Sequence, residues 1–125
     1  MVFEKFYIAD KNGKSNCVVR SLCKVLNREY DDVYNDLMKI AQKLKSHSFN
    51  DVEVFEKYMK DNNISKIEFK KDLKIKDIRL DKKTYVILCY DKEGYYHMIP
   101  IINNVIYDKN DDCMNLYVLA VYEKK

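Results

Sequence analysis

Hydrophobic residues recur at helical spacing in the first half of the chain and alternate as in strands in the second half. The helical spacing predicts three helices, at about residues 16–26, 31–45 and 51–62. The alternation predicts strands at 2–8, 64–69, 84–90, 95–102, 105–108 and 115–123, with a short helix at 73–80. Helices followed by consecutive strands are typical of an α+β fold, so we expect N-terminal helices packed on a C-terminal antiparallel sheet.

The predicted strands at 95–102 and 105–108 are separated by only two residues, which predicts a tight hairpin. Asn103 and Asn104 form a two-residue loop, because asparagine tolerates the positive φ that such a turn requires. The loop then sets the pairing, with Ile102 opposite Val105.

This pairing brings a histidine close to a carboxylate. It places His97 opposite Asn110, with Asp108 as the diagonal neighbour of His97 on the same face, about 5–8 Å away between β-carbons. A carboxylate at that position orients an imidazole and selects its tautomer. Asn110 is an alternative partner, since an amide oxygen also accepts an N–H bond. We favour Asp108 because Asn110 lies near the end of the paired region.

One cysteine lies where turn-forming residues give way to the first helix. Cys17 follows a polar loop, with Ser15 or Asn16 as the helix cap. Its position is off the apolar stripe of the helix, which argues against a role as core filling. The positive end of a helix dipole favours a thiolate. Together with His97 and Asp108, Cys17 provides the groups that a cysteine hydrolase requires.

Composition limits the class of protein. The chain has 125 residues, of which 47% are hydrophobic, and this length suits one domain over residues 1–125. The formal charge is only +3, so we expect no nucleic-acid partner. The many lysines of residues 60–83 are interpreted as a solvated face, and the tyrosines of the strands as sheet packing.

The spacing of the four cysteines matches no zinc pattern, and we expect no disulfide framework because no signal peptide is recognised. They are Cys17, Cys23, Cys89 and Cys113. The first residues lack the apolar run of a signal peptide, and no run approaches the length of a membrane span. We therefore expect free thiols in the cytoplasm, no metal, no cofactor and no membrane association, with Cys23 as a small buried hydrophobe.

Five short segments, taken in order, are similar to a known group of proteins. The segments are Asn-Cys-Val-Val-Arg-Ser-Leu at 16–22, Tyr-Asp-Asp-Val-Tyr-Asn-Asp-Leu at 30–37, Ile-Lys-Asp-Ile at 75–78, Tyr-Tyr-His-Met-Ile-Pro at 95–100 and Asn-Asn-Val-Ile-Tyr-Asp at 103–108. Together they resemble small, mostly uncharacterised bacterial and phage proteins with the papain-like cysteine peptidase fold. The resemblance spans nearly the whole chain.

The resemblance implies a role for each candidate residue. Cys17 is the expected nucleophile, His97 the base and Asp108 the group that orients the base. Papain-like peptidases form the oxyanion hole from the N–H of the cysteine and a glutamine side chain about six residues earlier. Lys11 occupies that place here, and the neighbouring Asn12 is the expected substitute donor.

Two functions follow from this resemblance. The first is a cysteine-dependent hydrolase, a peptidase, isopeptidase or amidase that acts on a protein or peptide substrate. The alternative is a catalytically weak or inactive papain-like scaffold that serves as a protein-binding factor of phage or mobile-element origin. The small size of the chain and the lysine at the oxyanion position motivate this alternative.

Overall fold

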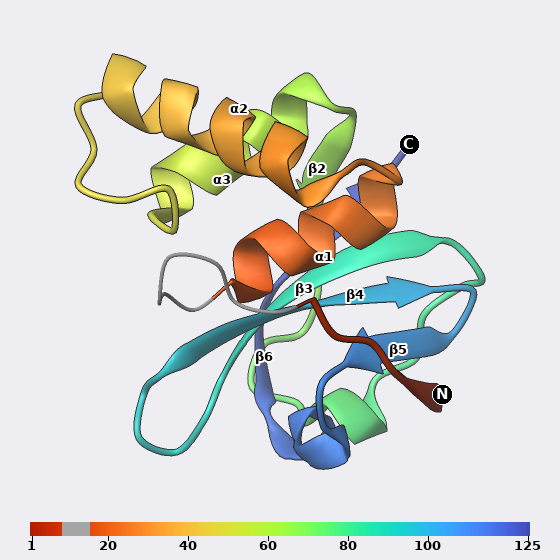
Figure 1. The fold of residues 1–125 in the computed structure, drawn as a ribbon. Helices are drawn as coiled ribbons and strands as arrows, with labels where there is room; N and C mark the ends of the chain where they lie inside the picture. Colours follow the sequence, from red (N-terminus) through yellow and green to blue (C-terminus); the bar gives the residue numbers. More distant parts are fainter. Residues whose placement is uncertain (9–15) are drawn as a thin grey trace.

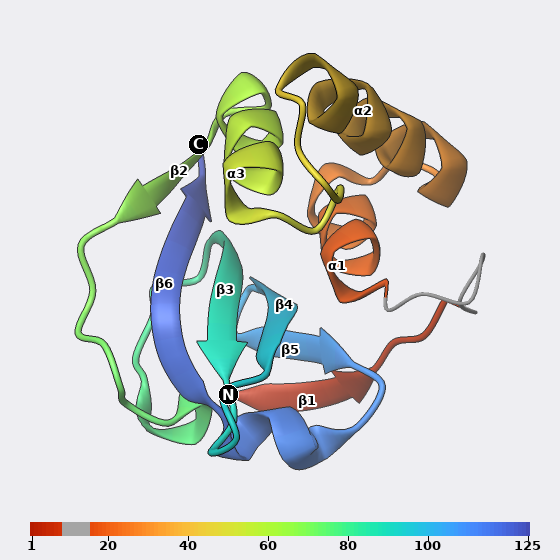
Figure 2. The ribbon, with the colours of Figure 1, turned by 90° about the vertical axis from the view of Figure 1, so that its left-hand side faces the viewer.

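A six-stranded mixed sheet forms the centre of the molecule (Figures 1 and 2). The computed structural model describes residues 1–8 and 16–125. The strands are β1 (Val2–Lys5), β2 (Ile64–Ile67), β3 (Thr84–Tyr90), β4 (Tyr96–Ile102), β5 (Val105–Asp108) and β6 (Tyr117–Lys124). Their order across the sheet is β1-β5-β4-β3-β6-β2, so strands from both ends of the chain join one sheet.

Three helices lie together on one face of this sheet, as Figure 2 shows. They are α1 (Cys17–Leu26), α2 (Tyr30–Lys43) and α3 (Val52–Asp61). Helix α1 lies directly on β4 and β3, α2 packs against α1, and α3 packs against α2 and β2. None of the described helices has the length and apolar character needed to cross a bilayer.

The alternating side chains of the sheet build two hydrophobic layers, one on each face. Val86 and Leu88 of β3 face the helices, whereas Ile87 and Cys89 face the opposite layer. That second layer is closed by the connection after β2 and by two short 3₁₀ helices, η1 (Ile75–Asp77) and η2 (Asp111–Asn115). Burial of both faces explains why β3 is apolar along most of its length.

The α+β class is present, but the prediction of an antiparallel sheet is wrong for one strand. Strand β1 pairs with β5 in parallel, from Val2↔Val105 to Lys5↔Asp108. Alternation of apolar and polar residues is the same in both strand orientations, so the pattern could not reveal this. The predicted helix at 73–80 is reduced to η1, and β1 ends at Lys5 rather than at residue 8.

The predicted hairpin turn is confirmed. Asn103 and Asn104 have φ angles of 51° and 64°, and Ile102 pairs with Val105. The ladder continues only to Ile101↔Ile106. The predicted pairing of His97 with Asn110 is therefore wrong.

Candidate active site

His97 and Asp108 are in direct contact at the open end of the hairpin. Nε2 of His97 lies 2.7 Å from Oδ2 of Asp108. The Asp108 side chain is 6% exposed and that of His97 is 28% exposed. His97 therefore presents one side to solvent, while its partner is shielded from competing water.

Asp108 is held by further donors. Nη2 of Arg20 donates to Oδ1 of Asp108 at 3.0 Å, and the backbone N–H of Lys109 donates to the same oxygen at 2.8 Å. Nη1 of Arg20 donates to Oδ1 of Asn16 at 2.7 Å, and Nδ2 of Asn16 donates to the carbonyl of Ile8 at 3.0 Å. Because both carboxylate oxygens are engaged, Asp108 has a defined orientation toward His97.

Cys17 is the first residue of α1 and is half-buried. The helix is fixed to β4 by a buried hydrogen bond from Oγ of Ser21 to the carbonyl of Met98, 2.9 Å long. Asn16 is the N-cap residue, but its side chain binds Arg20 and makes no cap hydrogen bond. The N–H of Cys17, at the first helical position, has no partner within the helix.

The pKa values of Cys17 and His97 move in opposite directions. Burial raises the pKa of the Cys17 thiol, but the hydrogen bond and charge of His97, the backbone of Met98 and the charge of Arg20 lower it by more. Burial lowers the pKa of His97, but hydrogen bonds to Asp108 and Cys17 and their charges raise it to about 9. These shifts favour a thiolate–imidazolium pair.

Asp108 supports this charge distribution. Burial raises the pKa of its carboxyl group, whereas the hydrogen bond and charge of His97, the N–H of Lys109 and the charge of Arg20 lower it below its ordinary value. Asp108 thus stays ionised beside the imidazole. Since Nε2 of His97 is engaged with Asp108, Nδ1 is the ring nitrogen that remains for the Cys17 thiol.

The other three cysteines have raised rather than lowered thiol pKa values. All four cysteines are free thiols, and Cys23, Cys89 and Cys113 are buried. Burial is the largest cause that raises the pKa of Cys23 to about 11 and that of Cys113 to about 12, and it raises the pKa of Cys89 as well. Cys17 is therefore the one cysteine of the chain whose surroundings favour the thiolate.

A cavity of about 200 Å³ adjoins the thiol and the imidazole. The residues that line it are Cys17, Val18, Asn50, Val52, Phe55, Leu88, Tyr96, His97 and Met98. Oδ1 of Asn50 is buried in this wall and accepts no hydrogen bond from the described residues. An acyl group placed in this cavity would lie beside both reactive side chains.

Three polar residues of the site were not singled out for it by the sequence pattern. Arg20 and Asn50 carry no local signal, because Arg20 lies within the first predicted helix and Asn50 directly precedes the third one. Asn16 was expected only as a cap. Their roles arise from contacts between distant segments, such as the pair of Arg20 and Asp108, which are 88 residues apart.

The remaining candidate residues are Asn12 and Asn110. Asn12 lies in 9–15, outside the described residues. Asn110 is the exposed N-cap of η2, and it lines a second cavity of about 300 Å³ together with His97. Nε2 of His97 lies within hydrogen-bond distance of Asp108. Across residues 1–8 and 16–125, no group of three His, Cys, Asp or Glu side chains is arranged to hold a metal ion.

Comparison with known proteins returned no matching family model, no matching curated protein and no matching solved structure.

Proposed function

We propose that this chain is a cysteine-dependent hydrolase with a papain-like arrangement of Cys17, His97 and Asp108. The observation that carries the proposal is the 2.7 Å contact of His97 with a buried aspartate, beside a half-buried thiol whose pKa is lowered mainly by that histidine. A structural cysteine or histidine needs neither feature. The substrate is a protein or peptide, and four free cysteines are consistent with action in the cytoplasm.

The reaction begins with a proton transfer from the Cys17 thiol to Nδ1 of His97. The thiolate attacks a carbonyl carbon, a C–S bond forms, and the carbonyl electron pair moves to oxygen. The backbone N–H of Cys17 donates to this oxyanion, and the family resemblance adds the side chain of Asn12 as a second donor. Asp108 holds the imidazole ring throughout.

The second half of the reaction restores the thiol. His97 donates its proton to the leaving nitrogen as the C–N bond breaks, which leaves an acyl thioester on Cys17. His97 then removes a proton from a water molecule that attacks the thioester. The C–S bond breaks, the acid is released, and His97 returns the proton to the sulfur.

The first test measures alkylation of each cysteine by iodoacetamide as a function of pH. We expect Cys17 to react well below pH 7, and this reactivity to be lost in His97→Ala. Cys23 and Cys113 serve as internal references, because their raised pKa values keep them protonated in the same pH range. Peptide mass spectrometry identifies the modified residue.

The second test measures acyl transfer with p-nitrophenyl acetate. Wild-type protein is expected to release a burst of nitrophenolate and to carry a transient acetyl group on Cys17. His97→Ala should slow this burst by about 10²–10⁴-fold. Alkylation of Cys17 near pH 8.5 in both proteins, with no burst, would support the protein-binding alternative instead.

A further inference from the structure

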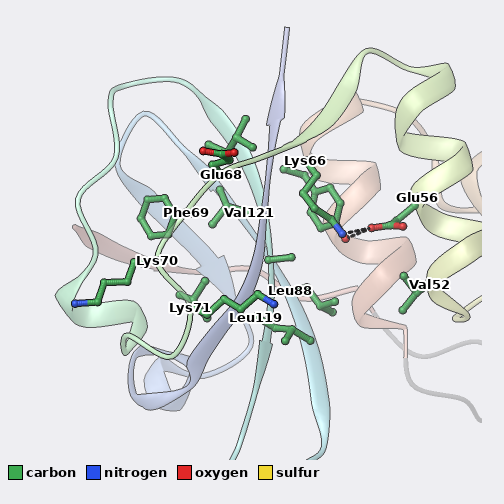
Figure 3. A pocket seen from close by; sticks show the side chains of 14 residues that line it. Val52, Glu56, Lys66, Glu68, Phe69, Lys70, Lys71, Leu88, Leu119 and Val121 are labelled. Atoms are coloured by element: carbon green, nitrogen blue, oxygen red, sulfur yellow. Dashed lines mark hydrogen bonds and ion pairs between the residues drawn. The ribbon is translucent and has the colours of Figure 1, made fainter.

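A larger groove adjoins the cavity at Cys17. It has a volume of about 830 Å³ and is lined on one side by Val52 and Glu56 of α3 and on the other by residues 66–71. Its floor is formed by β6 and by Leu88 of β3 (Figure 3). Val52 and Leu88 also line the cavity that holds the thiol, so the two spaces are neighbours with common walls.

The groove exists because the connection after β2 separates from β6. Strand β2 follows β6 only as far as Ile67↔Val121. The connection returns at Asp72, whose N–H donates to the carbonyl of Val118 at 2.8 Å. Between these two attachments, residues 68–71 arch away from β6, and Leu119 is the extra residue of a bulge against β3. Leu119 and Ala120 therefore stay partly exposed on the floor, next to the largely buried Leu88.

The lysines of the groove differ in whether they have an ion-pair partner. Lys66 pairs with Glu56 at 3.0 Å and so is neutralised. Lys71 is exposed and has no ion-pair partner among the described residues. Figure 3 shows Lys71 extending over the floor toward Leu88, whereas the neighbouring Lys70 points away from the groove. Lys71 is thus the ammonium group that extends over the apolar floor, on the side of the thiol cavity. Glu68 also lines the groove and has no ion-pair partner among the described residues.

We propose that this groove binds the peptide substrate on one side of the scissile bond, with an apolar side chain on Leu88 and Leu119 and a carboxylate at Lys71. The inference rests on the proposed function, since it assigns a substrate preference to the same site. An extended peptide that reaches Cys17 through the common walls places its neighbouring residues over this floor. The carboxylate is supplied by an Asp or Glu side chain or by a chain terminus.

The test uses peptides that carry an iodoacetyl group and alkylate Cys17. Each peptide has a leucine and, at one of several positions, either Asp or Asn. The reactive group is attached at the N-terminus in one series and on a C-terminal diaminopropionate in the other, so that both chain directions are sampled. A further pair ends in a free carboxylate or an amide, which separates a side-chain carboxylate from a terminal one. The concentration at half-maximal alkylation rate is measured for every peptide.

We expect at least one Asp peptide or free-carboxylate peptide to reach its half-maximal rate at a concentration about threefold to tenfold lower than its neutral counterpart. The preference should disappear in Lys71→Met and persist in Lys70→Met, the matched control of equal charge. Because the ratio is taken within each variant, general changes in thiol reactivity cancel. High salt should reduce the ratio.

The inference is overturned if wild-type protein has no preference for a carboxylate, or if Lys71→Met retains it. This result is separable from a failure of the proposed function, because alkylation at about pH 9 requires only an ordinary thiolate. An unactivated Cys17 would therefore still report the preference of the groove. Conversely, an activated Cys17 without any preference rejects the groove assignment alone.

Discussion

Arg20 and Asp108 form a buried ion pair that connects the helix of the thiol to the strand of the carboxylate. The guanidinium Nη2 lies 3.0 Å from Oδ1, and the two side chains are 3% and 6% exposed. Since Arg20 is three residues after Cys17 and Asp108 contacts His97, this pair connects both halves of the candidate site.

Arg20→Met should strongly reduce the free energy of unfolding. It leaves the Asp108 carboxylate buried without its cationic partner on α1, a change that costs about 3–5 kcal/mol. Urea denaturation at neutral pH measures the loss. The control is Lys57→Met, which removes an exposed pair with Asp61 and should cost less than about 1 kcal/mol. Equal losses in the free energy of unfolding would show that the buried pair stabilises the fold no more than the exposed pair does.

Asp108→Asn should lower the pKa of His97. The change removes the charge and the charge-assisted hydrogen bond that, together with Cys17, raise this pKa to about 9, so it should move toward the ordinary value of about 6.5. NMR titration of the imidazole measures the shift. The control is Asp81→Asn at an exposed position, which should leave the titration of His97 as it is. An unchanged pKa in Asp108→Asn would contradict the orienting role assigned to this carboxylate.

The contribution of His97 to stability should depend on pH. Its pKa in the folded protein is raised to about 9, so the folded state holds the proton more tightly than the unfolded chain does. The stabilisation is therefore complete below about pH 6.5 and is lost as the pH rises through about 9. Urea denaturation of wild type and His97→Gln across this range gives the difference. A difference that grows with pH would reverse the sign and refute the assignment.

Asn50→Leu should stabilise the fold while it slows acyl transfer. The unpaired Oδ1 of Asn50 is buried in the cavity wall, and an unsatisfied buried acceptor costs about 1–3 kcal/mol. Leucine has a similar size and no such cost, so the free energy of unfolding should rise. The p-nitrophenyl acetate burst should become slower, because leucine changes the shape of the cavity wall beside Cys17. A variant that is both less stable and fully active would contradict this interpretation.

Much of the local structure could be predicted from the sequence. Strand β3 and strand β5 have the predicted bounds, and α1, α2 and α3 lie within one or two residues of theirs. These elements depend on periodicity and turn chemistry, which act over a few neighbouring residues. The proximity of His97 and Asp108 was also predicted, because a two-residue hairpin depends on the turn residues between its strands.

The errors came from contacts between distant segments. Strand β1 pairs in parallel with β5, and the β4–β5 ladder ends at Ile101↔Ile106, so Asn110 does not lie opposite His97. Nothing near β5 in the sequence encodes the parallel pairing, because β1 is about a hundred residues away. The α+β class itself was correct, whereas the papain-like fold stays a prediction.

The sequence by itself determined where the helices and strands form, that Cys17 begins a helix, and that a hairpin brings an aspartate toward His97. Only the tertiary structure decided that Arg20 neutralises that aspartate, that Asn50 lines the thiol cavity and that Lys71 lies in the adjoining groove. The physical reason is range: backbone preferences are set by near neighbours, whereas the burial and pairing of a charge depend on which distant surfaces meet.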